Sequence, residues 1–386
     1  MKRDVVLKPG GTSENVSKVT GKRAKNWSVR SNTGTRTALR PHPRATGEGP
    51  GTDHLTRRRL SPVPDVVLIL VGLVALVGGA ELIVRGGSKV AAGLGVAPII
   101  IGVTVVSIGT STPELAIGIE AATQGNGSLA IGNIAGTNVV NLLLILGLSA
   151  ALRPLEMHTQ TLRLDLPVMV GAAVLVAVLA WGGNISRGDG VLLVALAVVY
   201  TLVIVRIARR ERPFVKQEYD REYATPADTP ETPSRFVLHG ALLLVGIVIV
   251  VLGADLLVDG ASGLARARGI SEAVIGLTIV AIGTSAPELV TTVVSTVRGE
   301  RDIAVGNLLG SSVFNLLLIL GITAAVPAGG IAVEQDLMRI DLPVMVAVAL
   351  LCVPVFYSGR RVSRAEGIGF MALYGIYLTY LLTARV

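Results

Sequence analysis

The chain has 386 residues, of which 51% are hydrophobic and only 16% are charged. Ordinary soluble domains carry roughly 25% charged residues, so this composition leaves too few charges to cover a water-exposed surface and excludes an ordinary soluble protein. The single cysteine, Cys352, excludes a disulfide framework and a cysteine-based metal cluster.

Residues 1–62 form a basic segment rich in Arg, Lys, Ser, Thr, Gly and Pro, and we predict that this segment is a disordered tail. It carries much of the net charge of +8. No nucleic-acid-binding fold accompanies it, so we expect no nucleic-acid partner. Lysine becomes rare after Lys25, which makes a mis-assigned translation start an alternative explanation of the tail.

Apolar stretches long enough to cross a membrane as helices recur along the chain from Val66 onward. About 20 apolar residues cross the hydrocarbon core of a bilayer. The first half is predicted to span at 64–90, 97–122, 128–150, 162–182 and 188–209, and the second half at 236–265, 271–297, 302–326, 337–357 and 364–384. Between the two halves, residues 210–235 are polar and contain four prolines, which indicates a linker outside the membrane.

The two halves, 64–209 and 236–386, repeat one another. The sequence IGVTVVSIGTSTPELA from Ile101 returns as IGLTIVAIGTSAPELV from Ile275, and GNIAGTNVVNLLLILG from Gly132 returns as GNLLGSSVFNLLLILG from Gly306, both 174 residues later. Because each half holds an odd number of predicted spans, the second half must enter the membrane from the opposite face. The sequence therefore predicts an all-α polytopic membrane protein of about ten transmembrane helices, built as two inverted five-helix repeats.

The loops on the linker's side of the membrane are rich in basic residues, which predicts that the linker is cytoplasmic. These loops contain Arg85, Lys89, Arg153, Arg163, Arg298, Arg301, Arg360, Arg361 and Arg364. We expect an integral, multi-pass protein of the inner (plasma) membrane, in contact with membrane lipid.

Glu114 and Glu288 lie in the predicted spans 97–122 and 271–297, each directly after Gly-Thr-Ser-x-Pro. An ionised carboxylate at membrane depth is costly, so such residues usually face the interior of the bundle and serve transport. The preceding proline removes a backbone N–H and bends the helix. Unwound backbone is tolerated at this depth only where it is buried in protein or lines a cavity. The motif therefore predicts two broken helices with a carboxylate at each break.

Several oxygen-bearing side chains are predicted to converge on the two glutamates. Helical spacing places Ser107 and Ser111 on the face of Glu114, Ala281 and Ser285 on the face of Glu288, and Thr137 with Asn141 and Ser311 with Asn315 on the following helices. This shell contains oxygen and no sulfur or imidazole, which favours hard cations such as calcium and sodium. One calcium or two monovalent cations would cancel the charge of the two glutamates, so obligatory exchange is the expected outcome.

These motifs closely resemble those of the cation/calcium exchanger superfamily. The resemblance rests on GTSTPE from Gly109 and GNIAGTNVVN from Gly132, with GTSAPE from Gly283 and GNLLGSSVFN from Gly306, and it covers essentially everything after residue 64. It implies ten helices, of which the first and sixth slide across the others during alternating access. The chain differs from many sodium/calcium exchangers in carrying Asn315 where they carry Asp.

In sodium/calcium exchangers the glutamates are shared between the calcium and sodium sites, which the resemblance places on Glu114 and Glu288. It also implies that the main-chain carbonyls of Thr110 and Thr284 complete the calcium site. The flanking sodium sites are implied to use Ser107, Ser111 and Thr137 on one side and Ala281, Ser285 and Ser311 on the other.

The sequence thus predicts a secondary active antiporter, not an enzyme, that exchanges calcium for sodium, works as a monomer and carries no prosthetic group. Calcium/proton or potassium-linked calcium exchange is the alternative, and a cation channel or an intramembrane enzyme using Glu114 and Glu288 is more remote. Asn133 and Asn307 are expected to cap the broken helices. Glu81 and Asp255, which occupy matching positions in the repeats, are expected to have a structural or gating role.

Overall fold

The computed structural model describes residues 62–222, 233–269 and 281–384. The tail predicted over residues 1–62 lies outside these ranges except for its last residue. So do part of the linker and the first ten residues of the span predicted over 271–297. Arg59–Val386 forms one compact unit.

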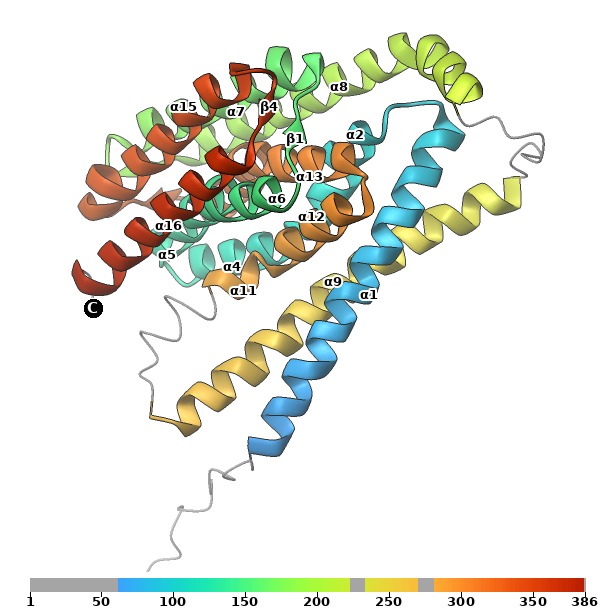
Figure 1. Ribbon diagram of the computed structural model, residues 1–386. Coiled ribbons are helices and arrows are strands. Elements are labelled where there is room, and N and C mark those ends of the chain that lie inside the picture. Colours follow the sequence, from blue (N-terminus) through green and yellow to red (C-terminus); the bar gives the residue numbers. More distant parts are fainter. Residues whose placement is uncertain (1–61, 223–232, 270–280, 385–386) are drawn as a thin grey trace, which may run out of the picture. The chain divides into compact units, whose positions relative to one another are not determined.

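The described part of the chain is almost entirely helical, and its helices follow the ten predicted spans (Figure 1). The first half contains α1 (Pro62–Leu94), α2 (Pro98–Ile101), η1 (Gly102–Val106), α3 (Ser107–Thr110), α4 (Thr112–Thr123), α5 (Gly127–Val139), η2 (Val140–Ile145), α6 (Leu146–Leu152), η3 (Thr161–Asp165), α7 (Leu166–Ala180) and α8 (Arg187–Glu222). The second half contains α9 (Pro233–Ala267), α11 (Ala281–Thr284), α12 (Ala286–Arg298), α13 (Arg301–Phe314), η5 (Asn315–Ile319), α14 (Leu320–Ala325), η6 (Leu337–Asp341), α15 (Leu342–Tyr357) and α16 (Arg364–Ala384). The η segments are single π-helical stretches within longer helices.

Eight described helices are long and apolar enough to cross a membrane. A ninth span is formed if the bent pair Pro98–Thr110 and Thr112–Thr123, which meet at 42°, is taken as one. The remaining predicted span, 271–297, is described only from Ala281. The chain is therefore an all-α polytopic membrane protein, as its composition predicted.

Two short strand pairs tie the halves together in a pattern that reflects the repeat. Strand β1 (Leu155–Glu156) pairs antiparallel with β4 (Arg361–Val362), and β2 (Asn184–Ile185) pairs antiparallel with β3 (Ile331–Ala332). Strands β1 and β3 follow the third span of their half, whereas β2 and β4 precede the fifth. Each pair thus joins one loop of each repeat, as expected for two halves related by a pseudo-twofold axis.

The helices α1 and α9 lie side by side and share a small apolar cluster that contains Leu76, Ile83 and Val250 (Figure 1). The other helices share a larger cluster that includes the fully buried Phe314 and Phe356. The first helix of each repeat therefore packs mainly on its counterpart, while the remaining helices form the body that contains the broken helices.

Pairs of glycines allow helices of different repeats to approach closely. A Cβ atom added at Gly367 would lie 2.6 Å from the carbonyl oxygen of Gly147, and one at Gly190 would lie 2.7 Å from that of Gly321. These two contacts are equivalent under the repeat, since both join the end of a third span to the start of a fifth. Small residues at such crossings are the usual means of bringing membrane helices into contact.

We expect Gly367→Ala to destabilise the protein because its new methyl group would meet backbone atoms that cannot move aside. Overpacking of this kind costs about 1–3 kcal/mol, and the midpoint of thermal unfolding in detergent should fall. The matched control is Gly369→Ala in the same helix, where an added Cβ meets nothing within 4 Å. Equal midpoints for the two variants would contradict this account of the helix crossing.

Candidate ion-binding site

The two predicted helix breaks are present and have the same geometry. Helix α3 ends and α4 begins around Ser111 (φ −84°, ψ 13°), and α11 and α12 meet in the same way at Ser285 (φ −88°, ψ 5°). A proline follows each break within the first turn of the new helix, where its missing N–H costs no hydrogen bond. Each break therefore starts a helix at the position that the repeated motif predicts.

At the first break, a side-chain hydroxyl replaces the backbone hydrogen bond that proline cannot make. Pro113 cannot donate to the carbonyl of Gly109, and the Thr112 hydroxyl donates to that oxygen instead at 2.8 Å. In the second repeat, Ala286 takes the place of Thr112 and has no hydroxyl to donate. The two breaks therefore differ in how their carbonyl groups are satisfied.

Glu114 and Glu288 occupy the first turns of α4 and α12, immediately after the breaks. Both side chains are 0% exposed, and their carboxyl groups are close enough to interact electrostatically. Within the described residues, no lysine or arginine is recorded as a partner of either carboxyl group. The structure therefore brings together the two acids that the sequence placed in separate halves of the chain.

A side chain of the first break reaches across to the glutamate of the second repeat. The Ser111 hydroxyl donates to Oε1 of Glu288 at 3.1 Å. The reverse contact is not made: the Ser285 hydroxyl and both carboxyl oxygens of Glu114 have no hydrogen-bond partner among the described residues. The site is thus symmetric in residue type but not in hydrogen bonding.

Several of the predicted ligands carry buried polar atoms that have no hydrogen-bond partner within the described residues. Within the described residues these are both carboxyl oxygens of Glu114, Oε2 of Glu288, the side-chain amide atoms of Asn141 and Asn315, and the hydroxyls of Ser285 and Ser311. A buried polar group left unpaired costs about 1–3 kcal/mol, so an arrangement of several calls for a ligand that satisfies them. Most of these atoms are oxygens, which suits a cation.

The described residues contain no group of three or more His, Cys, Asp and Glu side chains that could hold a metal ion. Any cation here must therefore be held by two carboxylates together with hydroxyl, amide and main-chain oxygens. Calcium and sodium accept such mixed oxygen shells, whereas zinc and copper prefer sites with nitrogen or sulfur.

The other predicted ligands that the structure describes are buried. The Ser107 hydroxyl donates to the carbonyl of Gly102 at 2.6 Å, so its proton is already engaged while its oxygen can still accept or ligate. Thr137 and Thr284 are buried at 3% and 7% exposure. The side chain of Ala281 lies outside the part of the chain whose side chains are described.

The prediction that Asn133 and Asn307 cap the broken helices is wrong, because neither α4 nor α12 has a side-chain hydrogen bond at its N-cap. Both asparagines lie inside helices, and the residue that caps α5 is Asn126, whose side chain accepts from the N–H of Leu129 at 3.2 Å. Inside α13, the Asn307 amide donates to the Thr292 hydroxyl at 3.1 Å, and its oxygen accepts from the Thr110 hydroxyl at 3.2 Å. The Asn307 side chain is thus hydrogen-bonded to neighbouring helices, as is common for polar amides inside membrane proteins.

A buried polar face on α12 was not predicted from the sequence. Thr291, Thr292, Ser295 and Thr296 are each at most 1% exposed, and they continue from Glu288 toward the end of the helix. The corresponding residues of the first repeat are Ile117, Gly118, Ala121 and Ala122. Comparing the two repeats position by position would have revealed this difference.

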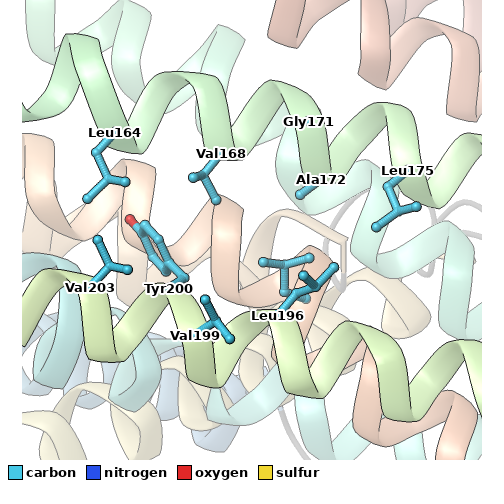
Figure 2. Close-up of a pocket in the computed structure, with 10 residues that line it drawn as sticks. Leu164, Val168, Gly171, Ala172, Leu175, Leu196, Val199, Tyr200 and Val203 are labelled. Atoms are coloured by element: carbon cyan, nitrogen blue, oxygen red, sulfur yellow. The ribbon is translucent and has the colours of Figure 1, made fainter.

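A hollow between α7 and α8, of about 260 Å³, is not part of this site (Figure 2). Its walls are apolar, with Leu164, Val168 and Leu196 among them, and Tyr200 at one end. The Tyr200 hydroxyl donates to the buried Asp165 at 2.9 Å. None of the residues that line the hollow is charged, so it lacks the anionic ligands that a cation site requires.

Comparison with known proteins agrees with this geometry. A family model described as "Sodium/calcium exchanger protein" matches residues 65–206 and 238–383. The chain is 39% identical to the inner membrane protein YrbG of Escherichia coli K12, over 81% of this chain and 94% of that protein. It is 32% identical to the sodium/calcium exchanger MaX1 of Methanosarcina acetivorans, over 82% of this chain and 98% of that protein. A solved structure of the sodium-calcium exchanger NCX_Mj superposes with a TM-score of 0.72 at 29% identity, covering 83% of this chain and all of that one.

Proposed function

Because the chain belongs to the sodium/calcium exchanger family, we propose that it is a secondary active antiporter that exchanges calcium for sodium across the membrane by alternating access. The observation that carries the proposal is the meeting of Glu114 and Glu288, both fully buried, beside unpaired oxygen atoms from both repeats. Such an arrangement is costly in an empty protein and is relieved by a bound cation.

The two glutamates are the shared ligands of calcium and sodium in this proposal. The main-chain carbonyls of Thr110 and Thr284 complete the calcium site beside the breaks. The remaining ligands come from the side chains of Ser107, Ser111, Thr137, Asn141, Ser285, Ser311 and Asn315, and from the backbone of Ala281.

Exchange follows from the charge of the site. Two carboxylates that face each other without a counter-ion repel and are poorly solvated, so the empty protein should rarely change the side to which it opens. A bound calcium ion, or two bound sodium ions, cancels both charges and allows the change. Calcium leaving on one side must then be replaced by sodium before the site returns.

In this proposal the linker, residues 210–235, is cytoplasmic. The basic residues in the loops on its side of the membrane support that orientation. The two repeats, residues 64–209 and residues 236–386, have inverted orientations in the membrane. Each repeat contributes one helix break to the shared site. Transported calcium and sodium are substrates here, and the protein works as a monomer.

Uptake of calcium-45 into sodium-loaded proteoliposomes tests the proposal. An outward sodium gradient should drive uptake, and uptake should stop when sodium is equal on both sides. Proton and potassium gradients of the same size, imposed separately, test the alternative coupling ions. Uptake driven equally well by a proton gradient without sodium would overturn the choice of sodium, and calcium flux without any counter-ion would indicate a channel.

A further inference from the structure

A basic cavity lies at the ends of three helices, away from the two glutamates. It has a volume of about 450 Å³, and its lining includes Glu81, Arg85, Ser88, Lys89, His239 and Arg298. Arg85 and Lys89 are in the last turns of the span Asp65–Leu94, His239 is near the start of the span Ser234–Ala267, and Arg298 ends α12. Residues at the ends of spans lie at the level of lipid headgroups.

Two arginines in this cavity are oriented by one carboxylate. Nε of Arg85 donates to Glu81 at 2.6 Å, and Nε of Arg298 donates to the other oxygen of Glu81 at 2.8 Å. These are the contacts that the structure records for the two guanidinium groups, whose side chains remain 68% and 55% exposed. Their terminal N–H groups are therefore held in place and still able to donate to an oxyanion.

Further donors in the cavity have no partner among the described residues. The Ser88 hydroxyl is buried without a hydrogen bond, and Lys89 is exposed and makes no recorded ion pair. Arg85, Lys89 and Arg298 carry three positive charges against the two of Glu81 and Glu300. The cavity thus combines a net positive charge with unused donors, which favours an anion with several oxygens.

The corresponding place in the other repeat has the opposite character. The offset of 174 residues relates Arg85 to Asp259, Lys89 to Gly263 and Arg298 to Gln124. Glu81 corresponds to Asp255, which interacts electrostatically with the acidic Asp259. The inverted repeat places this counterpart at the other face of the membrane. The positions that make the cavity basic are therefore not basic in the other repeat, so the packing of the fold does not require their charge.

We propose that the basic cavity binds a phosphate group, carried either by an anionic lipid headgroup or by a free phosphate. Basic pockets between membrane helices on the cytoplasmic side commonly bind such headgroups. The volume is sufficient for a phosphate with a glycerol attached. A phosphate held here contacts α1 through Arg85 and Lys89 and α12 through Arg298. If the proposed exchange involves movement of α1 along α12, the bound phosphate resists that movement.

The test measures binding without any cation gradient, so its outcome is independent of the proposed transport function. The full chain is purified in uncharged detergent without calcium, and its thermal unfolding is followed during two titrations at constant sodium concentration. One titration adds inorganic phosphate, with chloride at the same ionic strength as control. The other adds short-chain phosphatidylglycerol, with short-chain phosphatidylcholine as control.

Binding should raise the midpoint of unfolding in a saturable way. Arg85→Gln with Lys89→Gln should weaken binding about thirtyfold, and Lys89→Gln alone about fivefold. The second variant alters an exposed side chain without a recorded partner, so it should leave the fold unchanged. The matched control is Arg361→Gln with Arg364→Gln, which removes two exposed charges outside the cavity and should bind as the natural protein does.

Stabilisation by both ligands supports a general phosphate site. Stabilisation by phosphatidylglycerol alone identifies the lipid headgroup as the source, and stabilisation by inorganic phosphate alone identifies a soluble anion. The proposal is overturned if neither ligand acts beyond its control, or if the cavity variants and the control variant lose binding equally.

Discussion

Glu288→Gln should abolish calcium transport, and Glu114→Gln should do the same. Glutamine keeps the size of the side chain but removes the negative charge that a cation requires. Two unit charges 4 Å apart interact by about 4 kcal/mol at an effective dielectric of about 20, so the rate of sodium-driven calcium uptake should fall at least about a hundredfold. The measurement is calcium-45 uptake into proteoliposomes that contain equal amounts of each variant.

Glu120→Gln is the matched control for these variants. Glu120 lies on the same helix as Glu114, but its side chain is exposed and accepts a hydrogen bond from Gln124 at 3.1 Å. Its loss should leave uptake unchanged. Retained uptake in Glu114→Gln or Glu288→Gln, with a normally folded protein, would remove both residues from the proposed site.

Asn315→Asp should make calcium transport sensitive to the membrane potential. The proposed site holds two negative charges, so exchange of one calcium for two sodium ions moves no net charge. Asn315 is fully buried, and both of its side-chain amide atoms lack partners among the residues that the structure describes, so an aspartate there would add a third charge to the site. A site with three negative charges keeps a charge of −1 when it holds one calcium ion and is neutral when it holds three sodium ions. Uptake should therefore change with an imposed potential in the variant but not in the natural protein.

The control for this prediction is Asn126→Asp. Asn126 caps α5 at an exposed position, and aspartate is an equally good cap, so the new charge lies outside the site. Its transport should stay independent of potential. A natural protein that already responds to potential would contradict the two-charge site, as would an Asn315→Asp variant that remains insensitive.

Repetition within the sequence explains why so much of the fold could be predicted. Two long motifs at one offset indicate two similar halves, and an odd number of spans in each half requires them to be inverted. The proline after each Gly-Thr-Ser motif indicates a break, and the structure places those breaks at Ser111 and Ser285. The meeting of Glu114 and Glu288 then follows, because a buried charge in a membrane must face the protein interior.

Features that depend on contacts between helices were not predictable in the same way. Asn307 lies within α13 and forms hydrogen bonds with Thr110 and Thr292. Thr110 belongs to the other repeat, and Thr292 lies on the preceding helix, α12. The π-helical stretches, such as the one that begins at Asn315, leave no mark on hydrophobic periodicity. Helix α8 continues to Glu222, past the apolar span predicted to end at 209, because a helix can extend beyond the membrane on polar residues.

The central claim is that Glu114 and Glu288 share one cation, and calcium binding to the purified protein tests it most directly. Equilibrium dialysis with calcium-45, without sodium, should give one tightly bound calcium per chain, which is lost in both Glu114→Gln and Glu288→Gln and displaced from the natural protein by sodium. One calcium per chain retained in either variant at unchanged affinity would contradict a shared site.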